Sequence, residues 1–173
     1  MDKPYQRLGS ISNAHVGNEF ELRAQDYFSA IGLDLSRDFS IEIGAPGRIK
    51  KRHRFDLGSQ EHFVIVECKT HTWTAGDKVP SAKMTTWNQE MYYLHLAPAQ
   101  YRKILFVLRN VSESRNLSLA AYYVKTYSHL IPTVVDIWEF DTDTGKIHYP
   151  LQGKTNPELI QDDQSRAPYV TYT

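Results

Sequence analysis

The sequence predicts an α/β fold in which a mixed β-sheet is flanked by helices. Residues 14–32 place apolar side chains at helical spacing, whereas residues 38–44 alternate apolar and polar side chains as a half-buried strand does. The segment "KILFVLR" (residues 103–109) is continuously apolar between its terminal Lys103 and Arg109, which is typical of a strand buried on both faces. Helical and strand patterns that alternate along one chain pack as helices against a central sheet.

The other segments continue this alternation. Strands predicted at residues 53–59 and 61–70 follow the one at 38–44 so closely that the three are expected to form a meander. Ser81 is expected to cap the next helix. The apolar face of that helix contains Met84, Trp87, Met91 and Leu94. The remaining predicted elements are, in order, the apolar strand, a helix over 117–130, and a hairpin of strands over 133–141 and 146–151.

The composition is that of one globular domain spanning residues 1–173. Hydrophobic residues make up 41% of the chain and charged residues 23%, which excludes a disordered or membrane-embedded protein. No apolar stretch is long enough to span a bilayer, and residues 1–10 are too polar for a signal peptide, so a soluble cytoplasmic protein is expected. The single cysteine, Cys68, excludes an internal disulfide. Residues 152–173 show no clear period and are expected to form a loose tail.

Charged residues interrupt two of the apolar strands. Asp56 stands between Phe55 and Leu57, and Glu67 and Lys69 come directly after the next apolar run. Because side chains alternate across a strand, Glu67 and Lys69 share one face, and Asp56 lies on the face opposite Phe55 and Leu57. If the two strands pair as a hairpin, Asp56 lies beside Glu67 on the same side of the sheet.

This arrangement of charges indicates a metal site. Two close carboxylates raise each other's pKa unless a cation lies between them. Mg²⁺ prefers hard oxygen ligands and usually takes one or two protein carboxylates, so Asp56 and Glu67 are candidate ligands. Lys69 would hold or polarise a water beside the ion, and the combination suits phosphodiester hydrolysis. The alternative is an edge salt bridge between Lys69 and one of the carboxylates.

The same residues match a known motif. Asp56, ten intervening residues and then Glu67-Cys68-Lys69 form a pattern that resembles the PD-(D/E)xK nuclease superfamily. The resemblance covers residues 14–109 and implies a restriction-endonuclease-like core of order α-β-β-β-α-β. An additional α-β-β unit over residues 110–151 would decorate that core. Phe55 stands where the family name has proline, a position that varies within the superfamily.

The resemblance implies a role for each motif residue. Asp56 and Glu67 would be metal ligands, and the main-chain carbonyl of Cys68 would also face the metal. Lys69 would be the catalytic lysine. The thiol of Cys68 points away from the carboxylates in this arrangement, and we expect a small buried side chain there rather than a nucleophile.

Two features outside the strand pair also match the family. Glu19 corresponds to the acidic residue that many members carry on the first helix, and would then act in catalysis. In the alternative interpretation, Glu19 only forms an ion pair with Arg23 one helical turn away. Gln89 and Tyr93 form a Q-x-x-x-Y motif found in the exonuclease-like branch, which gives Gln89 a catalytic role. In the alternative interpretation, Gln89 and Tyr93 are only polar residues that flank the apolar face of the helix.

The expected function is that of a Mg²⁺-dependent deoxyribonuclease, with Mn²⁺ as a substitute ion. Such an enzyme would be a DNA endonuclease of the restriction or repair type that acts on duplex DNA, and the family implies that the chain could pair as a homodimer. The alternative is a catalytically inactive nucleic-acid-binding or interaction domain on the same fold. A metal-dependent phosphatase is a third interpretation, but the sequence lacks a phosphate-cradling glycine loop.

The charge distribution indicates where DNA would bind. The 20 basic and 20 acidic residues cancel over the whole chain, but "RIKKRHR" (residues 48–54) concentrates positive charge just before Asp56. Such a run is either a solvated loop or a phosphate-binding segment. The candidate DNA-binding residues are Arg48, Lys50, Lys51, Arg52 and Arg54, together with Lys83 in the segment that follows the lysine strand.

Overall fold

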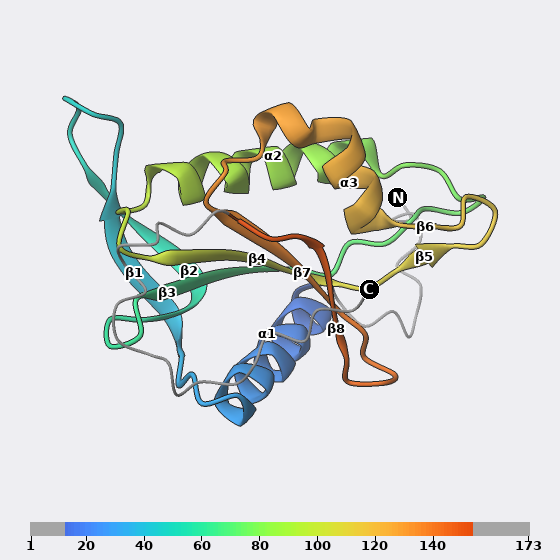
Figure 1. Ribbon diagram of the computed structural model, residues 1–173, viewed down its shortest axis with the longest axis horizontal. Coiled ribbons are helices and arrows are strands. Elements are labelled where there is room, and N and C mark those ends of the chain that lie inside the picture. Colours follow the sequence, from blue (N-terminus) through green and yellow to red (C-terminus); the bar gives the residue numbers. More distant parts are fainter. Residues whose placement is uncertain (1–12, 154–173) are drawn as a thin grey trace, which may run out of the picture.

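Six strands form one mixed sheet in the computed structural model, which describes residues 13–153 (Figure 1). The order across the sheet is β1-β2-β3-β4-β7-β8. The strands are β1 (Ser36–Ile43), β2 (Lys51–Ser59), β3 (Val64–Lys69), β4 (Arg102–Leu108), β7 (Val135–Phe140) and β8 (Ile147–Leu151). The short strands β5 (Val111–Ser112) and β6 (Leu117–Ser118) pair with each other in a separate ribbon.

Helices cover both faces of this sheet (Figure 1). Helix α1 (Asn13–Ala30) lies on one face, while α2 (Ser81–Leu96) and α3 (Leu119–Tyr127) lie on the other. A short 3-10 turn, Ser128–Leu130, follows α3. The predicted α/β class and mixed sheet are confirmed, and the elements up to β4 have the predicted order α-β-β-β-α-β.

The strand directions follow from the connections between strands. β1, β2 and β3 pair antiparallel, as the predicted meander requires. β3, β4 and β7 are parallel, because α2 and α3 carry the chain back across the sheet between them. β7 and β8 form the predicted antiparallel hairpin.

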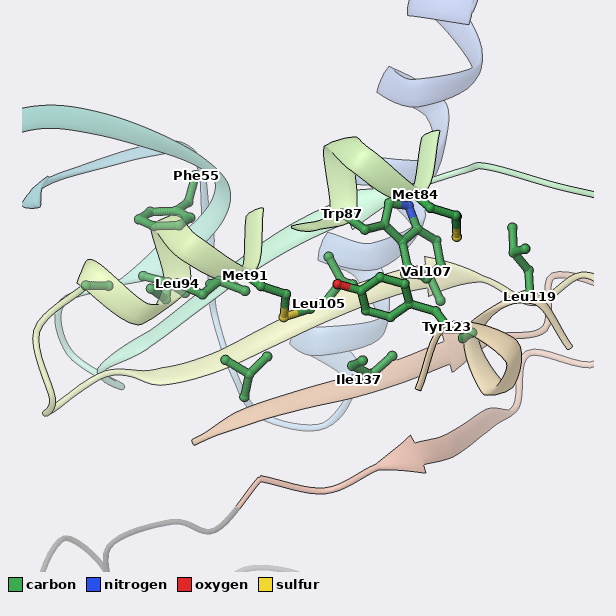
Figure 2. Close-up of a cluster of buried hydrophobic side chains, with 14 of the residues drawn as sticks. Phe55, Met84, Trp87, Met91, Leu94, Leu105, Val107, Leu119, Tyr123 and Ile137 are labelled. Carbon is green, nitrogen blue, oxygen red and sulfur yellow. The ribbon is translucent and has the colours of Figure 1, made fainter. Parts of the chain in front are cut away.

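Each face of the sheet has its own hydrophobic core. On the α2 side, the indole of Trp87 packs with the Tyr123 ring at the centre of the cluster shown in Figure 2. On the α1 side, Phe106 stacks with Phe140 and packs in tilted contact with Phe20 and Phe28. β4 contributes alternate side chains to the two cores, which explains why its sequence is apolar without interruption from Ile104 to Leu108.

Besides shifts at the ends of β3 and α3, three features of the structure differ from the sequence predictions. β2 begins at Lys51 rather than at His53, so part of the basic run is strand and not loop. Ser81 lies inside α2 and Pro80 occupies the capping position without a side-chain hydrogen bond, so the predicted serine cap is wrong. The β5–β6 ribbon was not predicted, because strands of two residues are too short to show a period.

A fourth difference concerns the faces of β2. Phe55 packs in the α2-side core and Leu57 in the α1-side core, although strict alternation places them together. The register of β1 and β2 skips the pair between Asp38 and Asp56, and Asp38 has a left-handed φ of 54°. Aspartate tolerates this conformation better than most residues. The irregularity turns Phe55 toward α2 right beside Asp56.

Within residues 13–153, no helix combines the length and the apolar character that crossing a bilayer requires. The predicted loose tail, residues 152–173, falls outside the described part of the chain from residue 154 onward.

Candidate active site

Asp56 and Glu67 meet where the ladder between β2 and β3 ends. The last paired residues are Leu57 and Val66, so the next position along both strands sets Asp56 opposite Glu67. Beyond the ladder, a side-chain bond links the two strands: Oδ2 of Asp56 accepts a hydrogen bond of 2.7 Å from the main-chain N–H of Cys68. The structure therefore brings together the two carboxylates that alternation predicted to be neighbours.

Lys69 contacts Glu67 of this pair and also a third carboxylate, that of Glu90. Its Nζ donates to Oε1 of Glu67 at 2.6 Å and lies 3.2 Å from Oε1 of Glu90. Glu90 comes from α2, which crosses this end of the sheet. All three side chains are largely buried, with 15% or less of the side-chain surface exposed. We call Asp56, Glu67 and Glu90 the carboxylate cluster.

Glu90 is the residue that sequence reasoning missed. It follows Trp87 by three positions and precedes Leu94 by four, so helical geometry places it on the buried face of α2. A carboxylate on an otherwise apolar helix face was the available signal, since burying a charge is costly unless it has a partner. The partner is Lys69.

The carboxylate cluster carries more negative charge than Lys69 can balance. Burial raises the pKa of Glu67 to about 8, and the charges of Asp56 and Glu90 act in the same direction against that of Lys69. Burial also raises the pKa of Asp56, although the Cys68 N–H and Lys69 oppose the shift. Burial alone would lower the pKa of Lys69, but the neighbouring carboxylates outweigh it and raise the pKa above its usual value.

One oxygen of the cluster has the properties expected of a metal ligand. Oε2 of Glu67 is buried and has no hydrogen-bond partner within the described part of the chain. Such an atom is costly in a folded protein unless a cation or a water satisfies it. No three His, Cys, Asp or Glu side chains in residues 13–153 form a ready-made metal cage. Mg²⁺ needs no such cage, because one or two carboxylates and several waters usually hold it.

Gln89 and Tyr93 lie beside the cluster and bond to each other. Nε2 of Gln89 donates to the Tyr93 hydroxyl at 2.8 Å, and the Gln89 side chain is exposed. The Tyr93 ring packs on His53 with ring centroids 4.2 Å apart. Burial lowers the pKa of His53, while the charges of Glu90 and Asp56 oppose the shift. Tyr93 thus connects α2 to β2 through His53, Gln89 bonds only within α2, and the α2 residue in contact with Lys69 is Glu90.

Glu19 and the Cys68 side chain lie on the α1 side of the sheet. The Glu19 carboxylate accepts a hydrogen bond of 3.0 Å from Arg23, and both side chains are about half exposed. Glu19 also lines a cavity of about 370 Å³ together with Thr70, the residue that follows Lys69. The structure therefore sets Glu19 at the same end of the sheet but outside the Lys69 network. The Cys68 thiol is buried in the α1-side core, and its burial raises its pKa.

His71 lies near Lys69 and Lys83, whose charges act on it. Its Nδ1 accepts a hydrogen bond of 2.8 Å from the indole N–H of Trp87. Burial lowers the pKa of His71 to about 4, and the charges of Lys83 and Lys69 add to the effect. The imidazole is therefore neutral at neutral pH. Lys83 itself is exposed on the first turn of α2.

The basic run lies at the far end of the β1–β2 hairpin. We call Arg48, Lys50, Lys51 and Arg52 the basic tip. All four side chains are exposed, and none forms an ion pair within residues 13–153. Arg54, closer to the site, lies 3.4 Å from the carboxylate of Asp38, and both side chains are largely exposed.

Comparison of the chain with protein-family models, with curated proteins and with solved structures found no match. The assignment of a function to the cluster therefore rests on the motif residues and on their geometry.

The raised pKa of Glu67 makes the stability of the metal-free protein depend on pH. Between about pH 4.5 and pH 8 the folded state holds a proton that the unfolded state has released, so the free energy of unfolding falls as pH rises through this window. Glu67→Gln removes that titration. From the low end of this pH window to the high end, we expect the free energy of unfolding of the wild type to fall by at least about 1.4 kcal/mol more than that of Glu67→Gln, the equivalent of one pKa unit.

Urea unfolding in the presence of EDTA, at several pH values, measures this difference. Added Mg²⁺ should restore stability to the wild type at pH 8 and leave Glu67→Gln unchanged. Parallel pH profiles for the two proteins would show that Glu67 titrates normally.

Proposed function

We propose that this chain is a Mg²⁺-dependent DNA endonuclease of the PD-(D/E)xK type, which hydrolyses phosphodiester bonds. The observation that carries the proposal is the excess of buried carboxylate over ammonium around Lys69. An edge salt bridge explains one carboxylate and one lysine. It does not explain why Asp56 and Glu90 lie beside the same pair, or why Oε2 of Glu67 is buried without a partner.

The order of the elements supports the same proposal. Asp56 is on the second strand, Glu67 and Lys69 are on the third, and α2 follows directly, as in the α-β-β-β-α-β core of that superfamily. The hydrogen bond between Asp56 and the Cys68 N–H ties the two halves of the motif together. Asp56 and Glu67 would hold the Mg²⁺ or Mn²⁺ ion, with the main-chain carbonyl of Cys68 as a further ligand.

When bound, the ion supplies Lewis-acid stabilisation of the phosphate and a water of lowered pKa. Lys69 contributes a positive charge. Because the carboxylates raise its pKa, Lys69 stays an ammonium at neutral pH and stabilises the negative charge that develops on the phosphate oxygens. Glu90 positions the Lys69 ammonium, which lies 3.2 Å from its Oε1.

Incubation of the protein with supercoiled plasmid, with Mg²⁺ or with EDTA, tests the proposal. We expect nicked or linear DNA only when Mg²⁺ or Mn²⁺ is present. A structured RNA incubated in parallel tests the choice of nucleic acid. Binding without cleavage would favour the inactive nucleic-acid-binding domain, and the absence of both would overturn the proposal.

The basic tip should provide salt-sensitive DNA binding. Replacing Arg48, Lys50, Lys51 and Arg52 by alanine should weaken binding to all duplex sequences alike, because contacts to phosphates carry no sequence information. Each lost phosphate contact should reduce the slope of log affinity against log salt by about 0.9. Fluorescence anisotropy at several salt concentrations measures that slope.

Lys125→Ala combined with Lys146→Ala is the control, since both lysines are exposed, one on α3 and the other in the turn between β7 and β8. If the basic-tip variant and this control have the same salt slope, the basic tip is only a solvated turn.

A further inference from the structure

The β1–β2 hairpin extends away from the body of the protein (Figure 1). Its ladder runs from Ser36 opposite Gly58 to Ile43 opposite Lys51. A tight turn closes the far end, where the N–H of Arg48 donates to the carbonyl of Ala45 at 3.0 Å and Gly47 adopts a left-handed φ of 72°. The end of the hairpin is therefore an ordered turn that projects into solvent.

Ile49 stands at this projecting end with 89% of its surface exposed, well above the 56% of Tyr92, the next large apolar residue in the described part of the chain. Isolated apolar residues on a surface are common and need no explanation. Ile49 differs because its neighbours in the turn and strand are the basic tip, whose side chains form no ion pair within residues 13–153, although Glu42 lies opposite Arg52 in the ladder. An apolar side chain surrounded by cations fits a ligand that presents phosphates around an apolar recess.

Duplex DNA presents that combination in its minor groove. Proteins that enter this groove often insert an aliphatic side chain between base steps while basic side chains bind the phosphates on either side. We propose that the end of the β1–β2 hairpin is a minor-groove wedge, in which Ile49 inserts at a base step and the basic tip binds the flanking phosphates. This inference rests on the proposed function and adds a second DNA contact remote from the carboxylate cluster.

The base of the hairpin fixes the position of this contact. The Phe39 ring covers Gly58 so closely that a Cβ on that glycine would lie 2.3 Å from a ring carbon, and His53 packs on Tyr93 of α2. Ile49 lies seven residues before Asp56 in the sequence, a span of about 23 Å at roughly 3.3 Å per residue along an extended chain. At 3.4 Å per base pair, this span corresponds to about seven base pairs between wedge and cleavage site.

Binding of duplex DNA to the Glu67→Gln protein tests the wedge without interference from cleavage. The duplexes carry a fluorescent adenine analogue whose emission rises when it unstacks. Adding Ile49→Ala should weaken binding about tenfold, since the side chain loses most of its burial in the complex. It should also abolish the rise in emission and leave the salt slope unchanged, because no phosphate contact is removed.

Ile31→Ala is the matched control, because Ile31 is also exposed but lies just beyond the end of α1. It should bind as the parent does. Equal affinity and equal emission for the Ile49→Ala and parent proteins would overturn the wedge and leave the nuclease proposal intact. No duplex binding by the parent itself would overturn both.

Discussion

Glu67→Gln and Asp56→Asn should each abolish Mg²⁺-dependent DNA cleavage while the protein stays folded. Either change removes one negative charge from the proposed metal site and keeps the size of the side chain. A metal ion supplies several kcal/mol of transition-state stabilisation, and every 1.36 kcal/mol is a factor of ten in rate. We therefore expect a loss of at least about 1,000-fold in single-turnover cleavage, with an unchanged circular dichroism spectrum.

Glu61→Gln is the control for this experiment, since Glu61 is exposed just before β3. It should cut as the wild type does. Wild-type rates for Glu67→Gln or Asp56→Asn would contradict the metal assignment. Removing one carboxylate reduces the repulsion within the cluster, so both variants should fold at least as stably as the metal-free wild type. Unfolding of either variant would show instead that the carboxylate is needed for structure.

Lys69→Ala should suppress cleavage strongly and leave Mg²⁺ affinity intact or improved. Asp56 and Glu67 would hold the ion, whereas the Lys69 ammonium only repels it. A positive charge prearranged at a developing anion is worth about 100- to 1,000-fold in rate, so we expect a loss of that size. Single-turnover cleavage and calorimetric Mg²⁺ titration on the same sample measure the two effects separately.

Two further variants sharpen this test. Lys69→Arg keeps the charge but changes its shape and reach, so it should restore little activity. Lys78→Ala removes an exposed lysine from the loop before α2 and should behave as the wild type. Combined loss of metal binding and cleavage in Lys69→Ala would mean that Lys69 maintains the structure of the site. Full activity in Lys69→Ala would reduce the Glu67-Cys68-Lys69 motif to a chance tripeptide.

The features predicted correctly from the sequence depend on local periodicity. Alternation along two strands was enough to place Asp56 opposite Glu67, and in the structure the two residues occupy the first position beyond the last ladder pair, Leu57 and Val66. The uninterrupted apolar run from Ile104 to Leu108 in β4 predicted burial on both faces, and its side chains do divide between the two cores. In these cases the pattern of a short segment determines which way each side chain points.

The features that were missed depend on tertiary contacts. Glu90 approaches Lys69 only because α2 crosses the end of β3, and spacing within α2 could not identify that partner. Phe55 faces the α2 core because the hairpin is irregular at Asp38, which is far from Phe55 in sequence. The basic run extends into β2 because its backbone pairs with β1, although its charged residues are typical of a loop.

Calorimetric titration of the wild type, Glu67→Gln and Glu61→Gln with Mg²⁺ at pH 8 tests the central claim most directly, namely that Asp56 and Glu67 form a metal site. We predict one binding event for the wild type and for Glu61→Gln, accompanied by proton release because the pKa of Glu67 is raised to about 8. The same event should be absent from Glu67→Gln. Equal Mg²⁺ binding by all three proteins, or binding by none of them, would contradict the claim.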